Sequence, residues 1–283
     1  VTRDMLDTVM AEGEPEAAGL VQGTIEEFAE DLAQVVHGFL TLPEWEGTEL
    51  ILVGGGFRSA RIGEITVGRA AVMLRTAGVA VTLKPIARDP DEAGLVGAAH
   101  LLPRPALQEA DAVLTADLGG TSFRAGLVLP RLAVAPDLGA AQLWRSETWR
   151  HRGEEVGRQD AVGRLAALLS DLAGEAASQG LRVAPVVGIG CPGTISPEGR
   201  ILRGGDNLPG DWHAPDFHLP EALARRLPRI GQVAPEVRLH NDAVCQALAE
   251  APEQRRVPRW GVLTIGTGLG NVRFTTLTAR ARA

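Results

Sequence analysis

The sequence predicts an α/β protein with two similar lobes around a central cleft, one of which is assembled from both ends of the chain. Two observations predict this class. Short apolar runs typical of strands alternate with helical patterns along most of the 283 residues. Two glycine-rich hairpins of one type also occur far apart, at residues 116–121 and 266–270, and each follows an apolar run. A third glycine cluster, at residues 54–56, precedes both hairpins.

The first hundred residues predict three helices and two strands. Residues 24–42 carry apolar side chains at helical spacing, and Thr24 with Glu27 forms a capping-box pattern at their start. A buried strand at 49–53 leads into the glycine cluster. A helix at 65–77, a strand at 79–86 and a helix at 90–102 follow, and residues 104–110 are expected to be a connection.

A second unit is expected to begin near residue 111. Strands at 112–116 and 122–129 flank the first hairpin, and residues 142–149 alternate like a third strand. A helix at 159–177, an apolar strand at 183–189 and a Pro/Gly-rich stretch at 191–219 follow. A short helix at 220–226, a strand at 237–240 and a helix at 242–251 complete the unit. This order, β-β-β-α-β-α-β-α, is that of a ribonuclease-H-like unit.

The hairpin that starts at Trp260 begins a second unit of the same kind, and its remaining helices and strands are found in residues 24–102. We therefore expect one ribonuclease-H-like lobe at 111–258. The other lobe is expected to be discontinuous and to consist of residues 1–110 together with 259–283.

Composition excludes several classes of protein. A net charge of −7 provides no clustered basic surface of the kind that binds nucleic acid. Two cysteines, Cys191 and Cys245, cannot form a disulfide framework or a four-ligand zinc site, which favours a reducing cytoplasm. The acidic N-terminus lacks the features of a signal peptide, and no uncharged apolar stretch reaches about 18 residues, so no membrane span is expected.

Asp117, Gly119, Gly120 and Thr121 predict a phosphate-binding hairpin. Glycine lets backbone N–H groups approach phosphate oxygens with no Cβ in the way, and the threonine hydroxyl adds a donor. Asp117 is expected near Mg²⁺, through water, because this ion keeps several of its waters. The alternative is a plain hairpin with a Gly-Gly turn.

Gly266, Thr267, Gly268 and Gly270 predict a second cradle of the same kind, the alternative being a tight turn in a β-rich edge. Because each of the two hairpins leads into an equivalent unit, together they favour phosphate binding over two plain turns.

The cluster of Gly54, Gly55 and Gly56 follows a strand and precedes a helix. Bare backbone here would let adenine or ribose lie flat against the chain, and the alternative is a flexible loop. The dinucleotide pattern GxGxxG fails at this place because Ser59 stands where its third glycine would be. The pattern does match at residues 188–193, but weakly, because Pro192 interrupts it and no helix opens.

Asn241 and Asp242 lie where a strand ends and a helix begins. Asp242 is a candidate base that accepts a hydroxyl proton during phosphoryl transfer, with Asn241 binding the same sugar. The alternative is a carboxylate that caps the helix. Asn207 and the polar loop around it, 205–212, suit recognition of a hydroxylated ligand, although an ordinary surface loop would have the same composition. The six histidines show no metal spacing, and His151 is expected to be a solvated loop residue.

Taken together, these residues resemble the ROK family of sugar kinases and repressors, in the hexokinase and actin superfamily. The likeness rests on residues 51–56, 116–128, 188–193, 207–210 and 263–270, and on Asn241 with Asp242, Ala243 and Glu250. Residues 93–101 also resemble the usual C-terminal end of that family. It implies that Asp242 is the catalytic base, that the glycine loops bind ATP, and that Asn207, Asn241, Gly193 and Gly210 contribute to the sugar site.

The sequence departs from the family pattern in three ways. The glycine cluster precedes both hairpins instead of following them, which implies a circular permutation. The family's G-E-x-G-H sugar motif is absent, and so is its cysteine-rich zinc motif, so no structural zinc is expected. Gly270 is followed by Asn271, where the family usually continues with glycine.

The function expected from this resemblance is ATP- and Mg²⁺-dependent phosphorylation of a hexose in the cytoplasm, with a homodimer implied by the likeness alone. One alternative is a non-catalytic sugar or nucleotide sensor on the same fold. A DNA-binding repressor fits less well, because residues 1–50 carry twelve acidic side chains and only Arg3 as a basic one. Polyphosphate as the donor is disfavoured by the acidic net charge.

Overall fold

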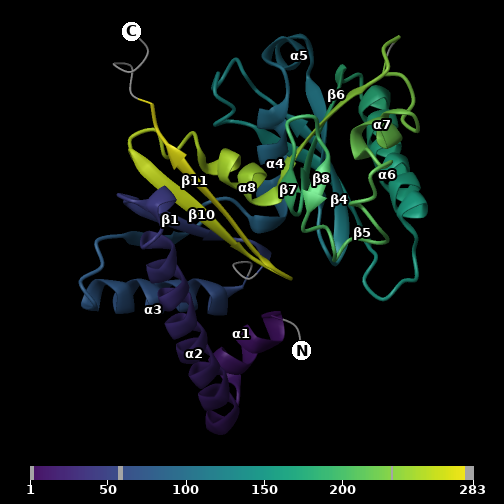
Figure 1. Ribbon diagram of the computed structural model, residues 1–283. Coiled ribbons are helices and arrows are strands. Elements are labelled where there is room, and N and C mark those ends of the chain that lie inside the picture. The colour runs from purple at the N-terminus through teal and green to yellow at the C-terminus, as the bar shows by residue number, and fades with distance from the viewer. Residues whose placement is uncertain (1–2, 57–59, 231, 278–283) are drawn as a thin grey trace. The chain divides into compact units, whose positions relative to one another are not determined.

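The computed structural model describes residues 3–56, 60–230 and 232–277. It has a mixed α/β fold and divides into two compact units (Figure 1). Unit 1 consists of residues 1–91 together with 253–283, and unit 2 of residues 92–252. None of the helices in the described residues is long and apolar enough to cross a membrane.

Unit 1 is built on a four-stranded sheet in the order β11-β10-β1-β2. Strand β10 from the C-terminal part of the chain runs parallel to β1 from the N-terminal part, and it forms an antiparallel hairpin with β11. The two segments therefore form one sheet although some 200 residues of sequence separate them. The elements are α1 (Arg3–Glu12), α2 (Pro15–Leu40), η1 (Pro43–Trp45), β1 (Leu50–Gly54), α3 (Arg61–Thr76), β2 (Thr82–Pro85), β10 (Arg259–Ile265) and β11 (Leu269–Thr275).

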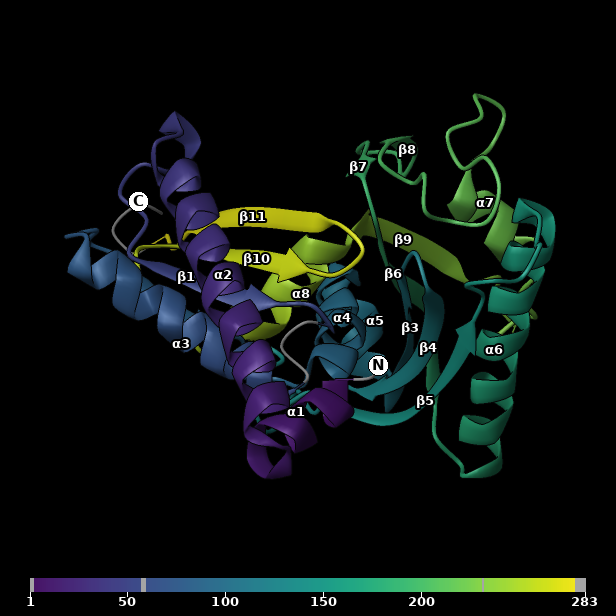
Figure 2. The ribbon, with the colours of Figure 1, turned by 90° about the horizontal axis from the view of Figure 1, so that it is seen from below.

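Helices α2 and α3 cover the same face of this sheet (Figures 1 and 2). Apolar side chains of both helices pack with strand side chains that point to that face, which removes most of this apolar surface from water. The buried members include Ala29, Leu32 and Val36 of α2, Val67, Ala70 and Leu74 of α3, and Ile51, Val53 and Leu263 of the strands.

The N-terminal helices are longer than the sequence predicts. Helix α2 begins at Pro15, in a position that tolerates proline because the first turn needs no N–H donor. The capping box assigned to Thr24 and Glu27 is therefore wrong: Thr24 lies inside the helix, and its hydroxyl donates to the carbonyl of Leu20 over 3.0 Å. Helix α1, which the sequence analysis did not predict, precedes it.

Unit 2 is built on a five-stranded sheet in the order β5-β4-β3-β6-β9. Strands β3, β6 and β9 are parallel, and β3-β4-β5 is an antiparallel meander. The order of the longer elements is the one predicted from residue 112 onward, and two short strands, β7 and β8, were not predicted. The elements from that point are β3 (Ala112–Leu118), β4 (Ser122–Leu129), β5 (Gln142–Arg150), α6 (Arg158–Ser178), β6 (Val183–Cys191), β7 (Thr194–Ile195), β8 (Ile201–Arg203), α7 (Leu219–Ala224), β9 (Glu236–Asn241) and α8 (Asp242–Glu250).

Helices α6 and α7 lie on one face of this sheet, and α8 and α4 (Pro90–Ala98) lie on the other (Figure 1). Strand β6 shows how the sequence fits both faces. Val187, Ile189 and Cys191 point into the core shared with α6 and α7, whereas Gly188 and Gly190 alternate with them and face α4 and α8. The glycine face lets those two helices approach the sheet backbone closely.

Residues 92–110, which the sequence analysis placed with the other lobe, pack within unit 2. Residues 93–99 are all buried there, and the carbonyl of Ala98 lies against Gly188. A helix that is apolar on all sides is stable only when neighbours surround it, and the sheet of unit 2 provides that environment. The connection expected at 104–110 is largely a short helix, α5 (Arg104–Glu109).

Candidate functional site

The carboxyl ends of the parallel strands bring several of the predicted site residues of unit 2 to one edge of the sheet. Asp117, near the end of β3, pairs with Gly190 of β6, and Cys191 pairs with Asn241 at the end of β9. The chain leaves β3 toward β4 on one side, while β6 adjoins it on the other. Open α/β sheets bind ligands outside such a point, because the connections diverge there and leave a crevice.

The turn after β3 is held by hydrogen bonds on both sides. The N–H of Gly119 donates to the carbonyl of Ser122 over 2.9 Å, and His151 Nε2 lies 2.9 Å from the carbonyl oxygen of Gly119. The prediction that His151 is a solvated loop residue is wrong: it is buried, and its ring makes an edge contact with Phe123 at 4.9 Å between centroids. No local pattern in the sequence marks this packing.

Asp117 is 8% exposed, and backbone of neighbouring elements lies against its carboxylate. Arg124 Nη1 lies 3.7 Å from its Oδ2, across the hairpin. Gly94 of α4 and Gly190 of β6 both lie next to this carboxylate, and neither has a side chain that would displace it. Asp117 thus presents carboxylate oxygens at the strand end, close to the hairpin turn, where they could accept hydrogen bonds or bind a cation.

Asn241 caps helix α8, a role that the sequence analysis considered for Asp242. Its Oδ1 accepts hydrogen bonds from the N–H groups of Ala243 at 3.0 Å and Val244 at 3.3 Å, and its Nδ2 donates to the carbonyl of Gly193 at 2.9 Å. The cap uses the side-chain oxygen, and the bond to Gly193 uses one of the two N–H groups of the amide. The second N–H is left for another partner. The cap fixes the first turn of α8, which carries Asp242.

Asp242 lies in this first turn and is partly buried. Burial raises the pKa of its carboxyl group, and a hydrogen bond from the N–H of Ala243 to Oδ1 at 2.9 Å opposes that rise. Burial also raises the pKa of Cys191 and Cys245, and the negative charges of Asp242 and Asp117 raise it further. Both thiols are therefore protonated at neutral pH, and they lie within electrostatic reach of both carboxylates.

The loop predicted to bind a hydroxylated ligand reaches the turn after β3. Asn207 is exposed, and an added Cβ on Gly120 would lie 2.7 Å from the Cβ of Asn207. Trp212 anchors the loop: it is 1% exposed, and its Nε1 donates to the carbonyl of Pro209 over 2.7 Å. The indole therefore belongs to the core and does not present a stacking surface to a ligand.

Two glycines assigned to the sugar site have packing roles in the structure. Gly193 has a φ of +103°, and a Cβ there would lie 2.2 Å from the carbonyl oxygen of Arg203. A Cβ on Gly210 would lie 2.7 Å from the backbone nitrogen of Arg158. Both positions exclude other residues for steric reasons, whatever the loops bind.

The glycine segments predicted to bind the nucleotide base and phosphates lie side by side in unit 1. Gly54 pairs with Thr264, and Gly55, with a φ of +81°, lies so close to β10 that a Cβ would be 2.5 Å from the carbonyl oxygen of Ile265. Gly56 follows it. The adjacent turn is closed by a 3.0 Å hydrogen bond from Gly266 to the carbonyl of Gly268.

The turn between β10 and β11 is exposed at Gly266, Thr267 and Gly268, and Gly270 lies in β11. A Cβ on Gly266 or Gly268 would meet nothing within 4 Å. Packing within the chain therefore does not require glycine at either position. The bare backbone of this turn is consistent with close approach of a ligand.

The structure thus groups the predicted site residues into two sets, one within each unit. Unit 2 holds Asp117, the turn after it, Asn207, Gly193, Gly210 and the Asn241–Asp242 pair. Unit 1 holds the two glycine segments. Among the described residues, no group of three or more His, Cys, Asp or Glu side chains is placed to hold a metal ion.

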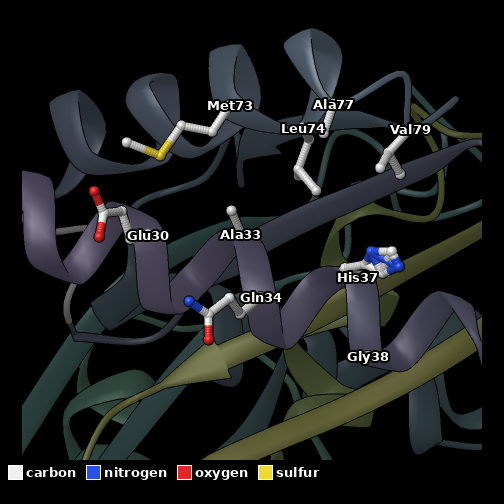
Figure 3. Close-up of a pocket in the computed structure, with 9 residues that line it drawn as sticks. All are labelled: Glu30, Ala33, Gln34, His37, Gly38, Met73, Leu74, Ala77 and Val79. Carbon is white, nitrogen blue, oxygen red and sulfur yellow. The ribbon is translucent and has the colours of Figure 1, made fainter.

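A pocket of about 650 Å³ lies between α2 and α3 and includes none of the predicted site residues (Figure 3). It is lined largely by small and apolar side chains, with Glu30, Gln34 and His37 on the α2 side. Figure 3 shows Met73 and Leu74 of α3 on the opposite side. Its lining residues are Glu30, Ala33, Gln34, His37, Gly38, Met73, Leu74, Ala77 and Val79.

Comparison with curated proteins identifies a homologue. The chain is 33% identical over 156 residues to a glucokinase from Thermotoga maritima, a match that covers 54% of this chain. The expected resemblance to a glucokinase-like sugar kinase is confirmed by this match. The chain spans 41% of the length of that glucokinase. No protein-family model matches the chain.

Solved structures similar to this chain include two ROK proteins. One is a ROK family glucokinase from Streptomyces griseus in complex with glucose and AMPPNP, with a TM-score of 0.41, 23% identity, and coverage of 58% of this chain and 45% of that one. Another is a ROK hexokinase from Thermus thermophilus, with a TM-score of 0.41, 24% identity, and coverage of 58% and 47%.

Proposed function

We propose that the chain is an ATP- and Mg²⁺-dependent hexose kinase of the ROK type, with two ribonuclease-H-like lobes in a circularly permuted order. The observation that carries the proposal is the common strand edge of unit 2, where Asp117, the glycine turn and Asp242 come together. The similarity to a glucokinase supports it. A cytoplasmic location and a homodimer belong to the same proposal and rest on likeness alone.

The permuted order is supported by the sheet of unit 1. Strand β10 runs parallel to β1 and leads into the glycine hairpin, as β3 in unit 2 runs parallel to β6 and leads into the first hairpin. In both units the glycine turn lies beside the carboxyl end of a parallel neighbour. Each unit therefore carries a glycine turn in an equivalent place on its own sheet.

In this proposal Asp242 is the general base. Burial raises the pKa of its carboxyl group, which makes the carboxylate a stronger proton acceptor than an exposed aspartate. It would accept the proton of the attacking sugar hydroxyl as the bond to the γ-phosphoryl group forms. Placement and electrostatic stabilisation carry most of such a reaction, so the rigid first turn of α8 matters as much as the carboxylate.

The residues around Asp117 fit a nucleotide with its metal ion. A carboxylate oxygen is the ligand type that Mg²⁺ prefers, and a single one suits an ion that keeps several waters. Gly120 and Thr121 would donate N–H and hydroxyl groups to phosphate oxygens. The N–H of Gly119 is bonded to the Ser122 carbonyl, and this residue would instead let a phosphate approach the turn because it has no Cβ. The turn at 266–270 in unit 1 would offer the same kind of bare backbone. When bound, Mg²⁺ would neutralise charge on the phosphates.

The sugar would contact Asn207 and the remaining N–H of Asn241, next to Asp242. Gly193 and Gly210 would support these contacts by shaping the two loops.

The test is a coupled assay of ADP release with Mg-ATP and a panel of hexoses. The wild-type chain should release ADP in a sugar-dependent manner, and Asp242→Asn should lower the rate by about 100-fold or more, the typical contribution of a general base. Asp171→Asn, an exposed aspartate on α6, is the matched control and should retain full activity.

Two results would contradict the proposal. Retention of more than about a tenth of the wild-type rate by Asp242→Asn would remove the base assignment. Absence of sugar-dependent ADP release with every hexose, in a chain that is nevertheless stabilised by a sugar in thermal unfolding, would show a binding protein in place of a kinase.

A further inference from the structure

Helix α4 is seated on the sheet of unit 2 through glycines. A Cβ on Gly97 would lie 1.7 Å from the carbonyl oxygen of Cys245 in α8, and a Cβ on Gly188 would lie 2.2 Å from the carbonyl oxygen of Ala98. A Cβ on Gly126 of β4 would lie 2.9 Å from a methyl of Leu95. The helix is therefore in direct backbone contact with its neighbours and cannot move outward without losing that packing.

One of these close approaches involves a site residue. A Cβ built on Gly94 would lie 2.7 Å from Cγ, 2.8 Å from Oδ2 and 3.1 Å from Oδ1 of Asp117. All three separations are shorter than ordinary van der Waals contact. On another side, a Cβ on Gly190 would lie 3.4 Å from Asp117 Oδ1. The carboxylate therefore occupies the space that a side chain at residue 94 would take.

A glycine inside a helix lowers its stability by about 1 kcal/mol relative to alanine, so its presence calls for a local reason. At Gly94 the Asp117 carboxylate supplies that reason. We propose that Gly94 is a positioning residue, which fixes the direction in which Asp117 presents its oxygens at the end of β3. This inference rests on the proposed role of Asp117 toward Mg²⁺.

The consequence for Mg²⁺ follows from geometry. A methyl group at residue 94 would force the carboxylate to rotate or shift, because the helix backbone behind it is packed against α8 and the sheet. A shift of about 1 Å in a positioning group can lower a rate by about 100-fold. The side chain of Asp117 would remain, but its oxygens would point away from the position that a hydrated ion requires.

The first experiment compares Gly94→Ala with Gly163→Ala. Gly163 is also a helical glycine in unit 2, but a Cβ there meets nothing within 4 Å. We expect Gly94→Ala to raise the Mg²⁺ concentration for half-maximal ADP release by about tenfold or more, and Gly163→Ala to leave it unchanged. Binding of Mn²⁺ in the presence of ATP, followed by electron paramagnetic resonance without sugar, should weaken in parallel.

The second experiment is a double-mutant cycle in urea unfolding, which needs no activity. Gly94→Ala should lower the unfolding midpoint in the wild-type background. In the Asp117→Ala background the carboxylate is gone, so the same change should leave the midpoint unchanged or raise it. Equal losses in both backgrounds would mean that the methyl collides with another group, and would overturn the proposal.

The metal readout separates positioning from packing. Coupling in the cycle without any change in Mg²⁺ or Mn²⁺ dependence would make the contact purely structural and would also overturn the proposal. A wild-type chain that neither releases ADP nor binds Mn²⁺ with ATP would instead refute the kinase function itself. The two failures are therefore distinguishable.

Discussion

Replacement of Asn241 tests whether this residue is a structural cap, a sugar contact or both. In Asn241→Ala, helix α8 loses the acceptor for the N–H groups of Ala243 and Val244, and the segment after β6 loses the 2.9 Å hydrogen bond to the Gly193 carbonyl. Both losses occur in the free protein, whether or not a sugar binds.

The magnitude follows from these contacts. Loss of an N-cap typically costs about 1 kcal/mol, and loss of the hydrogen bond to Gly193 adds about 1 kcal/mol. The sum of about 2 kcal/mol corresponds to a fall in melting temperature of roughly 4–8 °C for a unit of this size. Asn241→Ser keeps a capping oxygen but lacks the amide donor, so about half of the loss is expected.

The assay is urea or thermal unfolding of each variant, combined with the KM for the best hexose. Asn207→Ala is the matched control: Asn207 is exposed, so its loss should leave stability unchanged while raising the KM. An Asn241→Ala variant as stable as the wild type would refute the capping assignment. If Asn241→Ser restored half of the stability but none of the sugar affinity, the remaining amide N–H would be the sugar contact.

Two further predictions concern charged side chains. Burial raises the pKa of Asp242 above its ordinary value of 3.8, so the native state holds the carboxyl proton more tightly than the unfolded state. This protonation stabilises the native state fully below pH 3.8, and the stabilisation is lost as the pH rises through the raised pKa. Asp242→Asn should therefore be more stable relative to the wild type near pH 7 than near pH 3 in urea unfolding, and a gap that does not change with pH would contradict this. Asp7 of α1 caps α3, since its Oδ2 and Oδ1 accept from the N–H groups of Arg61 and Ile62, each at 2.8 Å. Asp7→Ala should destabilise unit 1 by about 1 kcal/mol and speed hydrogen exchange at the start of α3, whereas Asp31→Ala, on an exposed face of α2, should do neither.

Strong local patterns made much of the fold readable from sequence. Helix α6 was predicted from its helical spacing, and the strands around the first hairpin and strand β6 from short apolar runs bounded by turn residues. The structure contains all of them with small changes at their ends. Glycine clusters after apolar runs marked the turns at 119–121 and 266–268 as special, because only backbone without a Cβ combines such turns with close approach.

Local patterns gave wrong helix starts or caps where a residue distant in sequence provides the stabilising contact. Helix α2 extends back to Pro15 through Gly19 and Gly23, two residues that weaken helix propensity, because packing of its later turns on α3 and the sheet stabilises the whole helix. The N-terminus of α3 has no side-chain cap of its own, since Asp7 provides it from α1.

The sequence by itself determined most of the elements and the places of the candidate site residues along them: an aspartate at a strand end, an Asn-Asp pair at a helix start, and glycine at the turns. Only the tertiary structure decided that Asn241 is the cap, that His151 is buried against the Gly119 carbonyl, and that Gly94 borders the Asp117 carboxylate. The physical reason is that secondary structure follows interactions between neighbours in sequence. Burial and close approach depend on contacts between residues far apart in the chain, and a local pattern does not record these contacts.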